Sequence, residues 1–187
     1  YFIDIVRDDL LIEIQTAHFG AMKKKLADLL KAHQVLLIHP IAQEKWIVRE
    51  TAVGEFISRR KSPKKGQPLH IFKELMRIPH LLTHPNLSIG IWMTRQEEIW
   101  RDDGKGSWRR KRWSIYDHRL REVVAERQFS TAADWLTFLP DTLPSPFTNK
   151  ALQTAVFPKR NKQTIKRAQQ MSDTLRHAGL LTTVGKQ

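Results

Sequence analysis

A change in hydrophobic period over the first forty residues constrains the fold more than any other feature of this sequence. Residues 2–6 and 10–14 are short runs rich in Ile, Leu and Val around Arg7-Asp8-Asp9, which predicts a β-hairpin. From Thr16 the apolar residues recur every three or four positions, which predicts an amphipathic helix. The next apolar run, residues 35–38, predicts a strand that ends at Pro40. This order is typical of an α/β fold with a parallel crossover around the helix.

The middle of the chain predicts one more short strand at 46–48, a basic connector and a long hairpin. The connector is assigned to residues 58–68 because they combine consecutive cations with Pro and Gly. A helix is predicted over residues 69–82. Two long strands, residues 87–100 and 108–124, are then predicted on either side of a turn rich in Asp and Gly.

The last third of the chain predicts three helices followed by a strand, which is the element order of a winged helix-turn-helix. The helices are expected at 132–139, after the N-cap Thr148, and at 163–178 with Gly179 as the terminating residue. The strand is expected at 180–184. Four consecutive segments are therefore predicted: 1–57, 58–68, 69–127 and 128–187.

Charge and cysteine content narrow the class of protein. The 187 residues contain 32 Lys+Arg against 19 Asp+Glu, a formal net charge of +13, which predicts a polyanionic partner. DNA, duplex or branched, is the expected partner, RNA is the weaker alternative, and no membrane association is predicted. The absence of cysteine excludes a disulfide scaffold and Cys-ligated zinc. These features predict a cytoplasmic protein, and the apolar start without Met predicts a missing upstream segment.

Two carboxylates are predicted to face each other in the N-terminal hairpin. If Asp8-Asp9 forms a two-residue turn, paired residue numbers sum to 17, and Asp4 lies opposite Glu13. Two adjacent carboxylates in an apolar hairpin repel each other unless a divalent cation lies between them. The alternative is that both are ordinary surface residues of a half-exposed hairpin.

The hairpin sequences Ile3-Asp4-Ile5-Val6 and Leu11-Ile12-Glu13-Ile14-Gln15 resemble the PD-(D/E)XK nuclease superfamily, including the archaeal Holliday-junction resolvases. The resemblance implies catalytic roles for Asp4, Glu13 and Gln15, and Mg²⁺ or Mn²⁺ held by Asp4, Glu13 and the Ile14 carbonyl. Gln15 departs from the family's usual lysine, and Lys23 or Lys24 is the candidate replacement. The implied fold is α/β, with a restriction-endonuclease-like core of mixed sheet and flanking helices. A long β-hairpin and a C-terminal winged helix-turn-helix follow this core, and the implied assembly is a homodimer.

Three basic segments are candidates for contact with DNA phosphates. One is the connector, one lies between Trp108 and Trp113, whose planes can stack on exposed bases, and one opens the last helix. Their residues are Arg59, Arg60, Lys61, Lys64, Lys65, Arg109, Arg110, Lys111, Arg112, Lys162, Lys166, Arg167 and Gln170. If residues 109–112 are in a strand, alternation places Arg109 and Lys111 on one face and Arg110 and Arg112 on the other.

Two functions are therefore predicted from the sequence, and a third, RNA binding through the basic hairpin between Trp108 and Trp113, stays open. The first is a divalent-metal-dependent, structure-selective DNA endonuclease that hydrolyses phosphodiester bonds. The second is a non-catalytic DNA-binding or regulatory protein on a degenerate nuclease core, which Gln15 favours.

Overall fold

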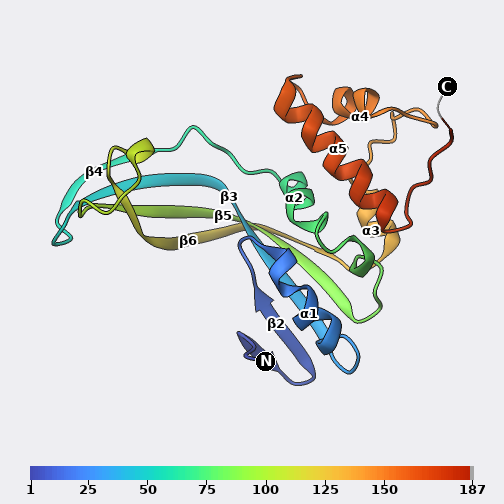
Figure 1. Cartoon of the computed structure of the whole chain (residues 1–187), viewed down its shortest axis with the longest axis horizontal. Coiled ribbons are helices and arrows are strands. Elements are labelled where there is room, and N and C mark those ends of the chain that lie inside the picture. The colour runs from blue at the N-terminus through green and yellow to red at the C-terminus, as the bar shows by residue number, and fades with distance from the viewer. Residues whose placement is uncertain (186–187) are drawn as a thin grey trace. The chain divides into compact units, whose positions relative to one another are not determined.

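The computed structural model describes residues 1–185 and has an α/β fold with a mixed, six-stranded sheet and flanking helices (Figure 1). The strands are hydrogen-bonded in the order β1-β2-β3-β5-β6, and β4 pairs with β3. The coarse prediction of a mixed α/β sheet is therefore confirmed.

The N-terminal hairpin and the crossover are confirmed in detail. Strands β1 (Ile5–Arg7) and β2 (Leu10–Ile14) are antiparallel with Arg7 opposite Leu10, the register that the Asp8-Asp9 turn predicts. Helix α1 (Phe19–Leu29) follows and buries Phe19, Met22 and Leu26. Strand β3 then runs parallel to β2, so the first three elements form the predicted crossover.

Strand β3 (Gln34–Thr51) replaces the two short strands predicted on either side of Pro40. Residues 34–38 of β3 pair with β2, and residues 46–50 pair with β4. Pro40 lies between these two paired stretches, so its missing N–H interrupts neither ladder. The prediction that Pro40 ends the strand was wrong for this reason.

The basic connector predicted at 58–68 begins inside a strand. Strand β4 (Phe56–Lys61) pairs antiparallel with β3, with Arg60 opposite Ile47. The following residues are also held against β3, since the Gly66 N–H donates to the Ala42 carbonyl at 2.8 Å. A Cβ atom on Gly66 would lie 2.5 Å from that carbonyl oxygen, so the close approach requires glycine.

The helix predicted at 69–82 is broken into three short pieces, namely η1 (Pro68–Ile71), α2 (Phe72–Leu75) and η2 (Pro79–Leu81). Pro79 disfavours helical backbone at the preceding residue, and Ile78 has φ −135° and ψ 39°. The apolar residues of this segment, which recur every three or four positions, nevertheless face the core. Those that are buried include Ile71, Phe72, Leu75, Ile78 and Leu81.

Strands β5 (Leu87–Asp102) and β6 (Ser114–Phe129) form the long hairpin that the sequence predicts. The second strand begins later than expected, because Trp108–Arg110 form a 3₁₀ turn, η3. The predicted alternation of residues 109–112 between two faces of a strand was therefore wrong.

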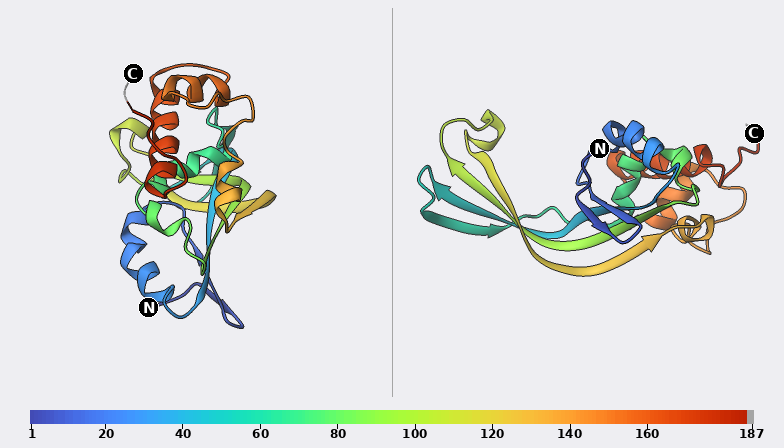
Figure 2. Two further views of the ribbon diagram at one scale, coloured as in Figure 1. Left: turned by 90° about the vertical axis from the view of Figure 1, so that its right-hand side faces the viewer. Right: turned by 90° about the horizontal axis from the view of Figure 1, so that it is seen from below.

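Helices α3 (Ala132–Leu136), α4 (Asn149–Val156) and α5 (Lys162–His177) confirm the predicted helical order. Thr148 is the N-cap of α4, accepting the Ala151 N–H at 3.1 Å, and Gly179 ends α5 with φ +76°. Helices α4 and α5 pack side by side (Figure 2). Residues 180–184 form no strand, so the first strand predicted for a wing is absent from the described chain.

The chain forms two compact units, each made of segments that are discontinuous in sequence. Unit 1 contains residues 1–39, 69–91 and 127–187, and unit 2 contains residues 40–68 and 92–126. The core of unit 1 includes fully buried Trp135, whose ring stacks on Phe129 with centroids 4.7 Å apart and whose indole N–H donates to the Leu82 carbonyl.

Candidate nucleic-acid interface

Asp4 lies just before β1 and Glu13 lies in β2, and each carboxylate has a partner of its own. Asp4 Oδ2 accepts the backbone N–H of Ile14 at 2.8 Å. Glu13 is buried at 4% exposure and lies 2.5 Å from the ammonium group of Lys25 on α1. Sequence reasoning considered Lys23 and Lys24 but missed Lys25. The helical period could have predicted this contact. Lys25 lies three residues after buried Met22 and directly before buried Leu26, so it is at the edge of the buried face of α1.

The Gln15 side chain is hydrogen-bonded within its own turn. Its side-chain amide donates to the Ala17 carbonyl, and its own carbonyl oxygen lies 2.7 Å from Nδ1 of buried His39. Burial lowers the pKa of His39, although the Gln15 carbonyl and the nearby Glu74 carboxylate oppose this change. Gln15 therefore stabilises the turn before α1 through both its side chain and its backbone carbonyl.

The donor set around Asp4 and Glu13 does not fit a divalent metal ion as arranged. Mg²⁺ and Mn²⁺ prefer several oxygen ligands, whereas an ammonium group lies against Glu13 and an N–H is bonded to Asp4. Within residues 1–185 no group of three or more His, Cys, Asp or Glu side chains is placed to hold a metal. The structure thus places Asp4 against the Ile14 N–H and Glu13 against Lys25, and the metal site that the resemblance implies stays a prediction.

Glu74 is another buried carboxylate of unit 1, which sequence reasoning missed. Its Oε2 accepts the backbone N–H of His18 at 2.8 Å and that of Phe19 at 3.4 Å, so it caps α1. Burial alone would raise the pKa of Glu74, but these N–H groups and the Lys73 ammonium hold it below its ordinary value. Glu74 is separated from His18 by 56 positions and from Phe19 by 55 positions. No local sequence pattern predicts a contact over that separation.

The α5 groove is a cationic hollow of about 410 Å³ in unit 1, between the segment 69–73 and helix α5. Its lining residues are Leu69, His70, Lys73, Gln163, Lys166, Arg167 and Gln170. Three of these side chains are cationic, two are amides and none is a carboxylate. The structure therefore gathers Lys166, Arg167 and Gln170, as the sequence predicts for a DNA-binding face, and adds His70 and Lys73. Lys162 is exposed at the start of α5 but does not line the groove.

Arg167 makes the groove electrostatically unusual. It is half-buried, burial lowers its pKa, and among residues 1–185 it forms no ion pair with a carboxylate. Burial and the Arg167 guanidinium together lower the pKa of His70 to about 4. A partly desolvated guanidinium without a carboxylate partner is costly, so the groove favours an anionic ligand.

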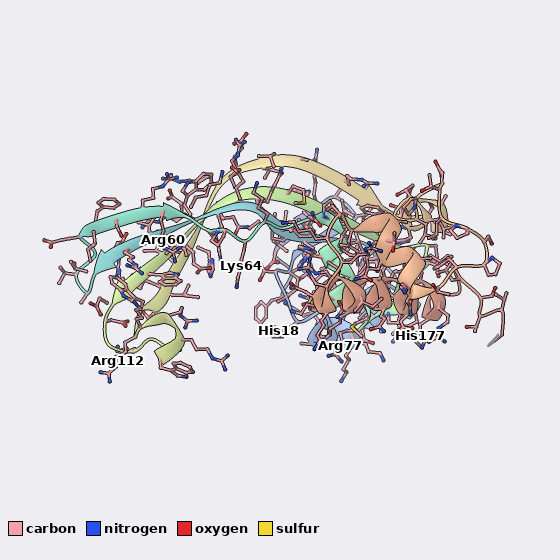
Figure 3. All side chains as sticks on the ribbon, turned by 90° about the horizontal axis from the view of Figure 1, so that it is seen from above. His18, Arg60, Lys64, Arg77, Arg112 and His177 are labelled. Atoms are coloured by element: carbon pink, nitrogen blue, oxygen red, sulfur yellow. The ribbon has the colours of Figure 1, made fainter. Side chains whose placement is uncertain are left out.

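The basic run on and after β4 divides into two groups in unit 2. Arg59 pairs with Glu97 and Lys61 pairs with Glu44, and both cations also lie over the ring of Trp46. In the described chain no carboxylate pairs with the remaining members, Arg60, Lys64 and Lys65, two of which are labelled in Figure 3. Two of the five predicted basic residues of this segment are therefore used to hold neighbouring strands together.

The run Arg109-Arg110-Lys111-Arg112 lies in η3 and the two turn residues that follow it in unit 2, not on a strand face. Arg110 is half-buried and its Nε donates to the Trp113 carbonyl at 3.2 Å, so it serves the loop itself. Arg109, Lys111 and Arg112 are exposed (Figure 3 labels Arg112), and none of the four is ion-paired to a carboxylate within the described residues.

None of the helices in residues 1–185 is both long enough and apolar enough to cross a membrane.

The family model of a domain of unknown function, DUF8091, matches residues 1–130. A protein of Treponema pallidum (strain Nichols), described as uncharacterized, is 34% identical over 145 residues, which is 77% of this chain and 58% of that protein. The chain thus spans less than two thirds of the length of this relative. No solved structure matches. The matched residues include the N-terminal hairpin, the crossover and strands β3 to β6. The chain belongs to the DUF8091 family.

Proposed function

We propose that the protein binds DNA through its phosphate backbone without cleaving it. The single observation that carries this proposal is the α5 groove, where the half-buried Arg167 lies with Lys73 and Lys166 and no carboxylate lines the wall. Lys73 has a carboxylate partner in Glu74 at 3.4 Å, whereas no carboxylate pairs with Lys166 or Arg167 in the described residues. Phosphate oxygens would supply a counter-charge to these two cations, and the amides of Gln163 and Gln170 can donate hydrogen bonds to the same oxygens. The net charge of +13 supports a polyanion as the partner.

The non-catalytic alternative is favoured over the endonuclease because of the partners of Glu13 and Asp4. The Lys25 ammonium forms an ion pair with Glu13, and the Gln15 amide donates to the Ala17 carbonyl in its own loop. A hydrolytic reaction through a metal ion needs an open set of oxygen ligands, and these side chains do not offer one. The cleavage activity that the nuclease resemblance implies therefore remains a prediction, with its own test in the Discussion.

Substitution of Arg167 and Lys166 tests the proposal. The double variant Arg167→Ala and Lys166→Ala should weaken the binding of a DNA duplex and reduce the slope of log K against log salt by about 1.8, since each lost phosphate contact removes about 0.9. Lys162→Ala is the matched control, because Lys162 is a cation of the same helix outside the groove. An unchanged slope in the double variant, or an equal loss in the control, would contradict the assignment of the groove.

A further inference from the structure

The loop of residues 103–113 in unit 2, called here the Trp108 loop, is held in its conformation by hydrogen bonds between its own residues. Asp103 accepts hydrogen bonds from the Lys105 N–H and the Ser114 hydroxyl, and the Ser107 carbonyl accepts the N–H groups of Arg110 and Arg112. The Gly106 N–H donates to the Arg112 carbonyl, and a Cβ atom on Gly106 would lie 2.0 Å from the Trp113 backbone. The loop is therefore tied to itself across its whole length.

Two consecutive residues of this loop are in a strained backbone conformation. Lys111 has φ 51° and Arg112 has φ 67°, in the left-handed region that side chains other than glycine rarely adopt. Strain of this kind persists where the surrounding contacts enforce it, and it concentrates at functional positions. Here it turns Lys111 and Arg112 outward on the same short loop that carries Trp108 and Arg109.

The rings of the two tryptophans of the loop differ in their exposure to solvent. Trp113 is half-buried and the Arg49 guanidinium lies over its ring at 5.0 Å. Trp108 is 80% exposed, and the Arg109 guanidinium lies over its ring at 5.7 Å from the centroid. One indole face is therefore open to a planar ligand, with three exposed cations beside it.

We propose that the Trp108 loop binds single-stranded nucleic acid by stacking Trp108 on an unpaired base, while Arg109, Lys111 and Arg112 contact the flanking phosphates. The inference rests on the proposed function, and it names the class of nucleic acid that this loop selects. In a duplex the π-faces of the bases are covered by their neighbours, whereas an unpaired base offers a face to an aromatic side chain. A membrane surface is less suited to this loop, because one exposed indole among three cations gives little apolar area for insertion.

The test compares a single-stranded oligonucleotide of about 12 nucleotides with its duplex, using fluorescence anisotropy titrations of the full chain. Trp108→Ala should weaken single-strand binding by about five- to 140-fold, the range that corresponds to the loss of one stacked base. Duplex affinity and the salt slope for both ligands should not change, because no charge is removed. Trp108→Phe should restore most of the loss, since a phenyl ring still stacks. Leu120→Ala, which truncates another exposed apolar side chain of unit 2, is the matched control.

The outcomes separate this inference from the proposed function. Equal losses for single strand and duplex, no loss in Trp108→Ala, or no single-strand binding by the wild type would each overturn the stacking role. Trp108-dependent binding to phosphatidylserine vesicles without an effect on single strands would replace it with a membrane role. If duplex binding fails while Trp108-dependent single-strand binding persists, the assignment of the α5 groove fails and this inference stands.

Discussion

His70 offers a quantitative test of whether phosphates enter the α5 groove. In the free protein, burial and the Arg167 guanidinium lower the pKa of His70 to about 4, so the imidazole is neutral at pH 5 and above. A phosphate in the groove would offset the positive charge of Arg167 and raise this pKa toward the ordinary value of about 6.5. Because the bound state then takes up a proton, DNA affinity should rise as the pH falls from 7 to 5.

The size of the effect follows from the two pKa values. If phosphate restores the ordinary pKa in full, linkage gives a gain of about 20-fold between pH 7 and pH 5, and partial restoration gives less. The assay is a duplex titration at constant ionic strength with wild type and His70→Gln, whose side chain does not titrate. The variant keeps the contributions of the other histidines, so the difference between the two proteins isolates His70. The same pH dependence in both proteins would refute the reasoning.

Protein stability must be followed in the same experiment, because it responds in the opposite direction. The folded pKa of His70 is depressed below its unfolded value, so the unfolded state binds more protons between pH 6.5 and 4. The stability that neutral His70 contributes is present above pH 6.5 and is lost as the pH falls toward 4. Circular dichroism at pH 5 therefore confirms that the titrated protein is folded.

The metal hypothesis and the α5 packing give two further predictions. With Mn²⁺ and linear, flapped or four-way DNA, we expect no cleavage by the wild type; cleavage that Glu13→Gln abolishes would restore the endonuclease hypothesis, because Glu13 is an implied metal ligand. Met171→Ala should lower the free energy of unfolding by about 2–5 kcal/mol, because Met171 is buried at 1% exposure. Chemical denaturation measures this loss, and unchanged DNA affinity in the folded variant would separate the buried face of α5 from the groove face.

The parts of the fold that depend on local sequence could be predicted. The Asp8-Asp9 turn gave the register of the hairpin, the period of Met22 and Leu26 gave α1, and the cap Thr148 gave the start of α4. Each of these features is decided by residues within one or two turns of backbone, which is why pattern reasoning reached them.

The parts that depend on distant contacts could not be predicted. The Glu74 cap on α1 joins residues far apart in sequence, and β4 is held by pairing with β3 although its own side chains are mostly exposed. The α5 groove shows both cases. Lys166 and Gln170 share a helical face that the sequence reveals, whereas Lys73 and His70 reach the groove only through the packing of the broken segment 68–81.

The distribution of tryptophan allows the fluorescence of the two units to be measured separately. Of the six tryptophans, Trp135 alone belongs to unit 1, where it is fully buried, and the other five belong to unit 2. Trp135→Phe would therefore leave a protein whose indole emission reports on unit 2 alone. Comparing the emission changes of the two proteins during denaturation would show whether the units lose structure in one cooperative transition or in two. The distribution of a single residue type thus makes the cooperativity of this fold measurable without an added label.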